Sequence, residues 1–181
     1  MQPTKTRNDL WMNLALVAFL IGLDVVARLL PHAPGFMPIA ASALFAGRML
    51  RIPALAPVVP VLAMVLSALV LGPDDWRISL IVTVAIALPA FAGLLSRRWP
   101  GIAATVAVMV PCSLLFFAAS NFAVWAFSGM YSLDLAGLTQ CYVAALPFLQ
   151  NTVAGDLFWT GALFGGAWAI QNGALLAGRA R

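Results

Sequence analysis

Residues 78–95 read ISLIVTVAIALPAFAGLL, an uncharged apolar run that is followed by Ser96 and the pair Arg97 and Arg98. A helix needs roughly 20 apolar residues to cross the hydrocarbon core of a bilayer, and about 17 is the lower limit. The run is therefore long enough for one membrane span, and the two arginines fit the cytoplasmic edge of such a span. This pattern predicts an integral membrane protein.

Five further apolar stretches surround this run in the chain. They cover residues 10–30, 37–50, 53–71, 102–119 and 152–170. Together the six stretches predict an all-α fold, a polytopic transmembrane bundle of about six helices. The stretch at residues 37–50 is short for a span. A five-span alternative, in which this stretch lies on or dips into the membrane surface, therefore stays open.

The composition agrees with a chain that is mostly surrounded by lipid. Of its 181 residues, 63% are hydrophobic and only 9% are charged, and the mean hydropathy is +0.98. A water-soluble domain could not cover its surface with so few charges. Because no Ser-rich, Gly-rich or charged linker divides the chain, residues 1–181 are expected to form a single transmembrane domain.

The ten Lys and Arg residues are distributed unevenly about the six predicted spans. With a cytoplasmic N-terminus, only Arg28 and Arg77 lie outside. The other eight then lie inside, namely Lys5, Arg7, Arg48, Arg51, Arg97, Arg98, Arg179 and Arg181. The positive-inside rule therefore predicts that both termini are cytoplasmic. It also accounts for the net charge of +4, so no nucleic-acid partner is predicted.

The last predicted outer segment, residues 120–151, is longer and chemically richer than the other connections. Within it, residues 134–148 are apolar enough to be helical, but they are too few to cross a bilayer, and Pro147 lies near their end. We therefore expect an additional interfacial or re-entrant helix here. The other outer turns are predicted at residues 31–36 and 72–76.

Asp156 is the acidic residue with the strongest sequence evidence for a functional role. Thr152, Asp156 and Thr160 recur at intervals of four and share one helix face, and no basic residue lies within a turn or two of Asp156. A carboxyl group in a span must be solvated by a cavity, paired across the bundle or protonated. We interpret Asp156 as a ligand-binding group, with a structural hydrogen bond near the helix start as the alternative.

Amide, hydroxyl and aromatic side chains also gather in the outer segments, where they could line a pocket for a polar-aromatic ligand. Interfacial aromatic residues commonly form a belt at the membrane surface, and a lone loop histidine is usually solvated, so these remain the alternatives. The predicted substrate-binding residues are His32, Asn121, Trp125, Gln140, Tyr142, Asn151 and Asp156.

Two patterns predict contacts inside the bundle. Asp24 and Arg28 lie one helical turn apart, which allows an ion pair that spares both charges from facing lipid. Small residues at four-residue spacing let helices approach closely. The two such pairs are Ala18 with Gly22 and Gly161 with Gly165.

The motifs of common enzyme classes do not occur in the sequence. There is no GxxxxGK[ST] phosphate loop, and no HExxH or GxSxG motif. The chain has a single histidine, and its two cysteines, Cys112 and Cys141, form no CxxC pair. We therefore expect neither catalysis, nor a metal site, nor a bound cofactor.

Three stretches carry a resemblance to known proteins: RLLPHAPGFMPIAASALFAG at residues 28–47, SNFAVWAF at residues 120–127, and CYVAALPFLQNTVAGDLFWTGALFG at residues 141–165. They resemble a family of small bacterial membrane proteins that is itself similar to the S components, or substrate-binding subunits, of energy-coupling factor vitamin transporters. This resemblance implies six helices, a place in the bacterial cytoplasmic membrane, and an outward-facing vitamin site built from outer loops. It also implies a partner module made of a transmembrane scaffold and two ATPases.

The sequence therefore favours a membrane protein that captures a small micronutrient at its outer face. Cobalamin is a conceivable substrate because Cys141 or His32 could reach cobalt, but nothing in the sequence selects it over other vitamins. The alternative is a structural accessory subunit of a larger membrane complex, whose amides and aromatics would serve protein contacts. Membrane lipids are expected to surround the chain in either case.

Overall fold

The computed structural model describes residues 3–72 and 74–179, and these residues form helices and turns without any strand. Six α-helices and two short 3₁₀ helices follow one another along the chain. They are α1 (Pro3–Leu29), α2 (Ile39–Met49), η1 (Pro53–Leu55), α3 (Val58–Leu71), α4 (Trp76–Leu95), η2 (Ser96–Arg98), α5 (Ile102–Phe127) and α6 (Leu135–Arg179). The all-α fold with six helices, predicted from the apolar stretches, is confirmed.

Within the described residues, four helical segments are long and apolar enough to cross a membrane, which supports the prediction of a membrane protein. They are Asn8–Leu29, Pro53–Leu71, Trp76–Arg98 and Ile102–Phe127. Large apolar side chains on their outer faces are exposed; Leu69, for example, keeps 78% of its surface accessible. Such faces are suited to contact with lipid chains rather than with water.

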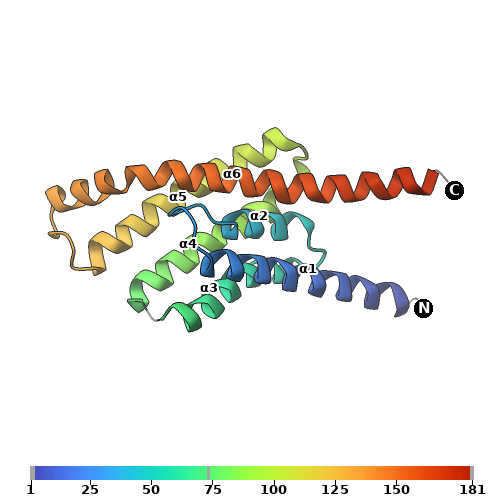
Figure 1. Ribbon diagram of the computed structural model, residues 1–181, viewed down its shortest axis with the longest axis horizontal. Helices are drawn as coiled ribbons and strands as arrows, with labels where there is room; N and C mark the ends of the chain where they lie inside the picture. The colour runs from blue at the N-terminus through green and yellow to red at the C-terminus, as the bar shows by residue number, and fades with distance from the viewer. Residues whose placement is uncertain (1–2, 73, 180–181) are drawn as a thin grey trace.

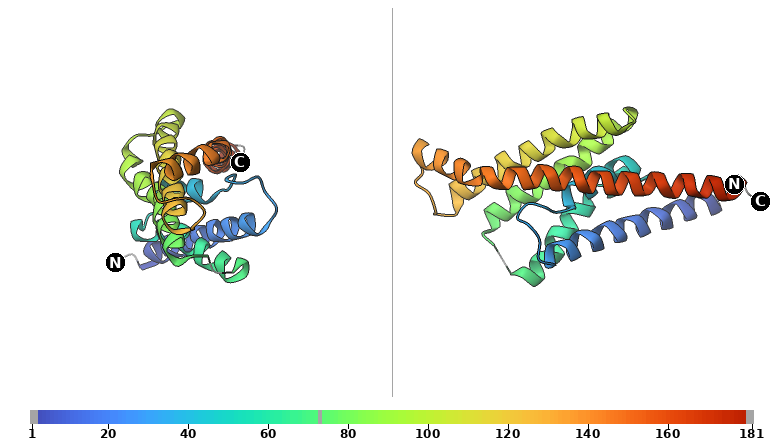
Figure 2. Two further views of the ribbon diagram at one scale, coloured as in Figure 1. Left: turned by 90° about the vertical axis from the view of Figure 1, so that its left-hand side faces the viewer. Right: turned by 45° about the horizontal axis from the view of Figure 1, so that its top comes forward.

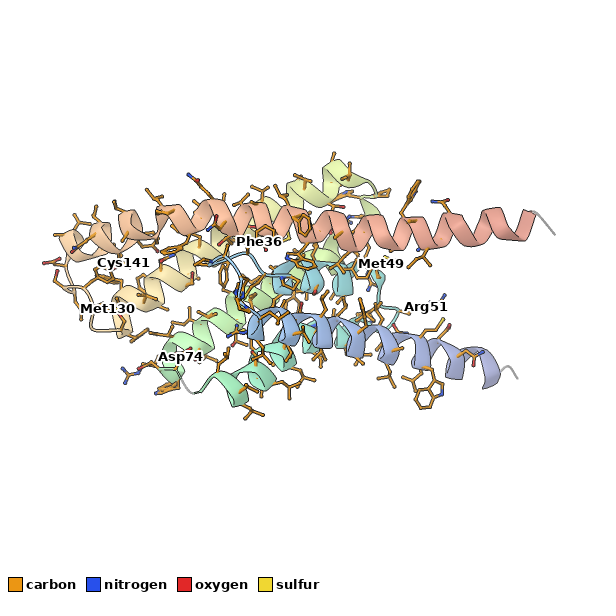
Figure 3. All side chains as sticks on the ribbon, in the orientation of Figure 1. Phe36, Met49, Arg51, Asp74, Met130 and Cys141 are labelled. Atoms are coloured by element: carbon orange, nitrogen blue, oxygen red, sulfur yellow. The ribbon has the colours of Figure 1, made fainter. Side chains whose placement is uncertain are left out.

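The helices run alternately in opposite directions (Figure 1). Both termini lie at one end of the bundle, which we call the terminal end, together with the α2–α3 and α4–α5 connections. The α1–α2, α3–α4 and α5–α6 connections lie at the other end, the loop end. The α5–α6 hairpin reaches beyond the remaining helices there (Figure 2). Arg51 marks the terminal end, and Asp74 and Met130 mark the loop end (Figure 3).

Helix α2 lies at the centre of the bundle. Its residues from Ile39 to Gly47 are all buried, and α2 packs against α1, α3, α4, α5 and α6. Arg97 closes its C-terminal end, because the guanidinium donates hydrogen bonds to the carbonyls of Gly47 at 2.7 Å and Leu50 at 2.5 Å. Helix α2 is thus enclosed by other helices, whereas the five-span alternative placed it on or near the membrane surface.

The closest helix contact joins α2 to α4 through Gly47 and Gly93. A Cβ atom added to Gly93 would lie 2.5 Å from the Leu44 carbonyl oxygen and 3.1 Å from the Gly47 Cα atom. The expected contacts at Gly22, Gly161 and Gly165 are wrong, because a Cβ atom at each of these positions would meet no atom within 4 Å. Ala43 and Gly47 on α2 also show the four-residue spacing of small residues, so the spacing does not distinguish the helix face that makes the close contact from the faces that do not.

The expected separate helix at residues 134–148 is also wrong. Residues 135–179 form one continuous helix of 45 residues, about 68 Å long at 1.5 Å per residue. The chain passes Pro147 without ending the helix because the first turns of α6 are held against α5. There, the Cys141 thiol lies 3.5 Å from the Asn121 carbonyl oxygen, and the Tyr142 hydroxyl donates to the Ala118 carbonyl at 2.6 Å.

Asp134 supports the start of this long helix. Its carboxylate accepts hydrogen bonds from the Gly137 backbone N–H at 2.7 Å and from the Ser132 hydroxyl at 2.9 Å. These two bonds hold the pKa of Asp134 below its usual range, since they favour the charged form. A charged carboxylate at this position also complements the positive end of the helix dipole.

The predicted ion pair between Asp24 and Arg28 does not form. Asp24 instead accepts a hydrogen bond from the Ser42 hydroxyl of α2 at 2.8 Å, and the Arg28 guanidinium lies 2.7 Å from the Met64 sulfur of α3. The one ion pair among the described residues joins Arg51 to Asp9. Contacts to neighbouring helices have replaced the contact within α1 that the spacing allowed.

The orientation of the bundle can be tested by labelling. Single cysteines at Asp74 and at Arg98, in a background without Cys112 and Cys141, are expected to react with a membrane-impermeant maleimide from opposite sides. A cysteine at Ala33 is expected to react from the same side as the one at Asp74, because both positions lie at the loop end. Labelling of the Asp74 and Arg98 sites from one side would contradict this topology, and disagreement between Ala33 and Asp74 would favour five spans.

The α2–α4 contact can be tested with a single methyl group. Gly93→Ala places a Cβ atom against backbone atoms that cannot move aside, and we expect the overpacking to lower stability by about 1 to 3 kcal/mol. Gly161→Ala is the matched control, because it adds the same methyl to a helix at a position with open space. Thermal unfolding of the purified proteins measures the difference. Equal unfolding temperatures for the two variants would contradict the packing described here.

Candidate functional site

A buried polar face on α6 forms the centre of the candidate site. Thr152, Asp156 and Thr160 are each less than 10% exposed, as expected for residues one turn apart on a face that points into the bundle. Asp156 accepts a hydrogen bond from the Ser113 hydroxyl of α5 at 2.5 Å. Ser113 is itself almost fully buried. The carboxyl group is therefore satisfied across the bundle by a neutral donor rather than by a positive charge.

Asp156 lines a cavity of about 30 Å³ next to the α1–α2 connection. The cavity walls come from that connection and from α2, α4, α5 and α6, and the lining residues are Gly35, Met37, Ile39, Ala40, Ile86, Phe116, Thr152 and Asp156. A volume of this size is sufficient for about one water molecule. A ligand larger than water can therefore reach the Asp156 carboxyl group only if the cavity enlarges.

The α1–α2 connection packs closely on α6 above this cavity. Gly35 adopts a left-handed backbone conformation with φ +82°, and a Cβ atom there would lie 2.5 Å from the Thr152 hydroxyl. Gly155 is equally constrained, since a Cβ atom on it would lie 2.9 Å from the Phe36 Cα atom. The Phe36 ring packs on Phe158 with a centroid distance of 5.5 Å. Figure 3 shows Phe36 near the middle of α6.

At the α5–α6 tip, three of the predicted pocket residues make hydrogen bonds within the protein. Asn121 donates to the Phe117 carbonyl at 2.8 Å, and the Trp125 indole N–H donates to the Ser132 carbonyl at 2.9 Å. Tyr142 bonds to α5 as described above, and Cys141 is buried beside it (Figure 3). These side chains stabilise the hairpin, and their donors are aimed at backbone carbonyls.

The seven predicted site residues therefore do not form one group. Asn121, Trp125 and Tyr142 lie together at the α5–α6 tip, whereas Asp156 lies 14 residues further along α6, about 21 Å from Tyr142. His32 and Gln140 are exposed and Asn151 is half-buried. One His32 ring nitrogen lies 2.7 Å from the Leu30 carbonyl oxygen. A role for each in ligand binding stays a prediction.

Sequence reasoning missed two groups of residues that the fold brings to α6. Ser113 is a single serine in an apolar helix, and nothing in its spacing marks it as the partner of Asp156. Arg48 fits the positive-inside pattern of the sequence, but in the structure it also lines a larger cavity of about 550 Å³ at the terminal end, together with Thr105 and Thr160. Arg48 lies far from α5 and α6 along the chain, so no local sequence pattern indicates that it contacts these helices.

The sequence was also compared with known families, curated proteins and solved structures. A model described as a family of unknown function, DUF6580, matches residues 8–176. No curated protein and no solved structure matches the chain.

If the side chains at the α5–α6 tip are structural, loss of the Tyr142 hydroxyl group should lower the stability of the protein. Tyr142→Phe removes the hydrogen bond to Ala118, and we expect a loss of about 0.5 to 1.5 kcal/mol in stability. Tyr131→Phe is the control, because the Tyr131 hydroxyl makes no hydrogen bond to any described residue. Thermal unfolding measures both effects. If Tyr142→Phe were as stable as the wild type but lost affinity for a copurified ligand, Tyr142 would belong to a binding site instead.

Proposed function

This chain belongs to the DUF6580 family, and we propose that it is a membrane-embedded binding protein that captures a small organic solute, as S components of vitamin transporters do. The observation that carries the proposal is Asp156, a buried carboxyl group that lines the cavity next to the α1–α2 connection and whose one hydrogen-bond donor among the described side chains is the neutral Ser113. Acidic groups inside membrane proteins are costly, and they commonly mark the path or site of a substrate.

The size of the cavity bears on how such a site would work. Pockets for small organic ligands typically occupy about 300 to 1,000 Å³, whereas this cavity measures about 30 Å³. A vitamin-sized solute therefore requires a part of the wall to move. The α1–α2 connection is the part best suited to do so, because residues 31–34 are exposed to the outside of the bundle and no helix covers them.

The chemistry of the cavity indicates what kind of solute it would hold. A carboxylate accepts hydrogen bonds, and it favours a ligand with ammonium, amide or hydroxyl donors. The apolar residues Ile39, Ile86 and Phe116 would contact the rest of the molecule. Neither Cys141 nor His32 lines this cavity, so the geometry favours a ligand held by hydrogen bonds over one held through a cobalt atom.

The proposal extends to orientation and partners. With the Lys and Arg residues of the terminal end in the cytoplasm, the α1–α2 connection beside the Asp156 cavity lies at the outer face of the bacterial cytoplasmic membrane. A captured solute would then pass inward with the help of a separate energy-coupling module, a transmembrane scaffold with ATPases, because the sequence contains no nucleotide-binding motif of its own. An accessory role in a larger complex is the competing function.

Substitution of Asp156 tests the proposed site. Asp156→Asn keeps the shape of the side chain but removes the charge, and a lost charge-assisted hydrogen bond costs about 1.5 to 3 kcal/mol. We therefore expect a roughly ten- to hundredfold weaker affinity for the small molecule that copurifies with the wild type. Native mass spectrometry of protein in mild detergent identifies that molecule, and titration with it measures the affinity.

Asp24→Asn provides a matched control. Asp24 is as buried as Asp156 and also accepts a hydrogen bond from one serine, but it does not line the Asp156 cavity. Asp24→Asn should therefore leave the affinity unchanged. Equal affinity for wild type and Asp156→Asn, with early unfolding of the variant, would show a structural role. Recovery of the wild type in a stoichiometric complex without any small molecule would favour the accessory function.

A further inference from the structure

A groove at the terminal end of the bundle lies outside the proposed solute site. It has a volume of about 550 Å³ and lies between the end of α2, the first turns of α5 and the middle of α6. Its walls are mostly apolar, with Ile102, Val106, Leu157, Phe164 and Trp168 among the lining residues. Gly161 and Gly165 keep it open, because neither position has an atom within 4 Å of where a side chain would begin.

Arg48 places a positive charge on this apolar groove. Its guanidinium donates to the Thr105 hydroxyl at 2.6 Å and to the Ser96 hydroxyl at 3.1 Å, and it lies 5.8 Å from the centre of the Phe164 ring. Its Nη2 atom is buried and makes no hydrogen bond to any described residue. No carboxylate of the described chain pairs with Arg48. An uncompensated guanidinium in apolar surroundings favours a bound anion.

Thr160 supplies a second polar group on the groove that lacks a partner. Only 4% of its surface is exposed, and its hydroxyl oxygen is buried without a hydrogen bond to the described residues. Buried polar groups in membrane proteins are normally satisfied, because an unmade bond costs free energy in an apolar environment. An N–H donor and a hydroxyl donor on the same groove suit a ligand with several acceptor oxygens, such as a phosphate.

The position of the groove indicates the source of that phosphate. The groove borders helix faces that are suited to lipid contact, since Ile102 and Trp168 keep 79% and 69% of their surfaces exposed. Arg48 lies in the last turn of α2, at the end of the bundle that also carries Arg51, Arg97 and Arg98. Basic pockets between transmembrane helices at such a level commonly bind the head groups of anionic lipids. The ligand class is therefore an anionic amphiphile from the surrounding bilayer.

We propose that this groove is a binding site for an anionic phospholipid. Arg48 and Thr160 hold the phosphate, and one acyl chain lies along the apolar wall beside Gly161 and Gly165. The lipid would complete the contact between α5 and α6 at the terminal end, where the groove separates them. Thr160 belongs to the same polar face of α6 as Asp156, but the groove and the Asp156 cavity share no lining residue, so we expect a change of Arg48 or Gly165 to leave solute binding intact.

Lipid titration with a charge variant tests the head-group contact. Delipidated protein in detergent is mixed with phosphatidylglycerol or with phosphatidylcholine of the same acyl chains, and native mass spectrometry measures the bound lipid. We expect phosphatidylglycerol to bind at least tenfold more tightly than phosphatidylcholine. Arg48→Gln should weaken the binding of phosphatidylglycerol about tenfold. Arg98→Gln, which removes an exposed charge at the same end, should leave this affinity unchanged.

A pair of glycine variants tests the acyl-chain contact without changing any charge. Gly165→Leu fills the groove, and it should abolish the selective binding of phosphatidylglycerol. Gly166→Leu adds the same side chain at the next residue, which also has open space but does not line the groove, and it should bind as the wild type does. This pair remains informative if Arg48→Gln fails to fold.

Three results would overturn the proposal. Equal binding of the two lipids would show that the head-group charge is not recognised. Equal lipid binding by Gly165→Leu and Gly166→Leu would show that the lipid does not lie in the groove. Displacement of the bound lipid by inorganic phosphate at comparable concentration would show that the occupant is a soluble anion instead of a membrane lipid.

Discussion

The close approach of α2 and α4 at Gly47 and Gly93 is the contact on which the rest of the bundle depends. Because neither residue has a side chain, the Gly93 backbone lies directly against the α2 backbone near Leu44 and Gly47. This fixes α2 in the middle of the bundle, where residues from Ile39 to Gly47 are all buried. Arg97, just after α4, then closes the end of α2. Helix α2 is too short to cross a bilayer alone. Neighbouring helices cover its sides, and Arg97 supplies hydrogen bonds to the backbone carbonyls at its C-terminal end.

The central position of α2 determines where polar groups can be placed. Ser42 on α2 is the donor for Asp24 of α1, and Arg48 at the end of α2 reaches Thr105 of α5. Between the two helices that follow α4, Ser113 of α5 is the donor for Asp156 of α6. Each buried acidic group has one hydroxyl partner from another helix. Each bond satisfies one polar atom where lipid and apolar side chains provide no alternative partner, while Asp24 Oδ2 and Arg48 Nη2 have no partner among the described residues.

The Asp156 cavity and the Arg48 groove lie at different levels of α6 and differ in chemistry. The cavity at Asp156 is small, contains an acceptor and lies next to an exposed connection, so the proposed capture of a solute requires the cavity to enlarge. The groove at Arg48 is larger, contains donors and borders the lipid-facing surface, which suits a molecule from the bilayer. The length of α6, 45 residues, allows one helix to supply residues to both sites and to the α5–α6 hairpin.

The sequence by itself determined the helical class, the six helices and the buried position of Asp156, because apolar runs and helical spacing are local properties of the chain. The tertiary structure decided the partners. It joined Asp24 to Ser42 instead of Arg28. It placed the close helix contact at Gly47 and Gly93 instead of at Gly22, Gly161 and Gly165, and it made residues 135–148 part of the last helix instead of a separate helix at the membrane surface. The physical reason is that these outcomes depend on contacts between helices, such as those of Cys141 and Tyr142 with α5. Such contacts join residues tens of positions apart, and no spacing within one helix encodes them.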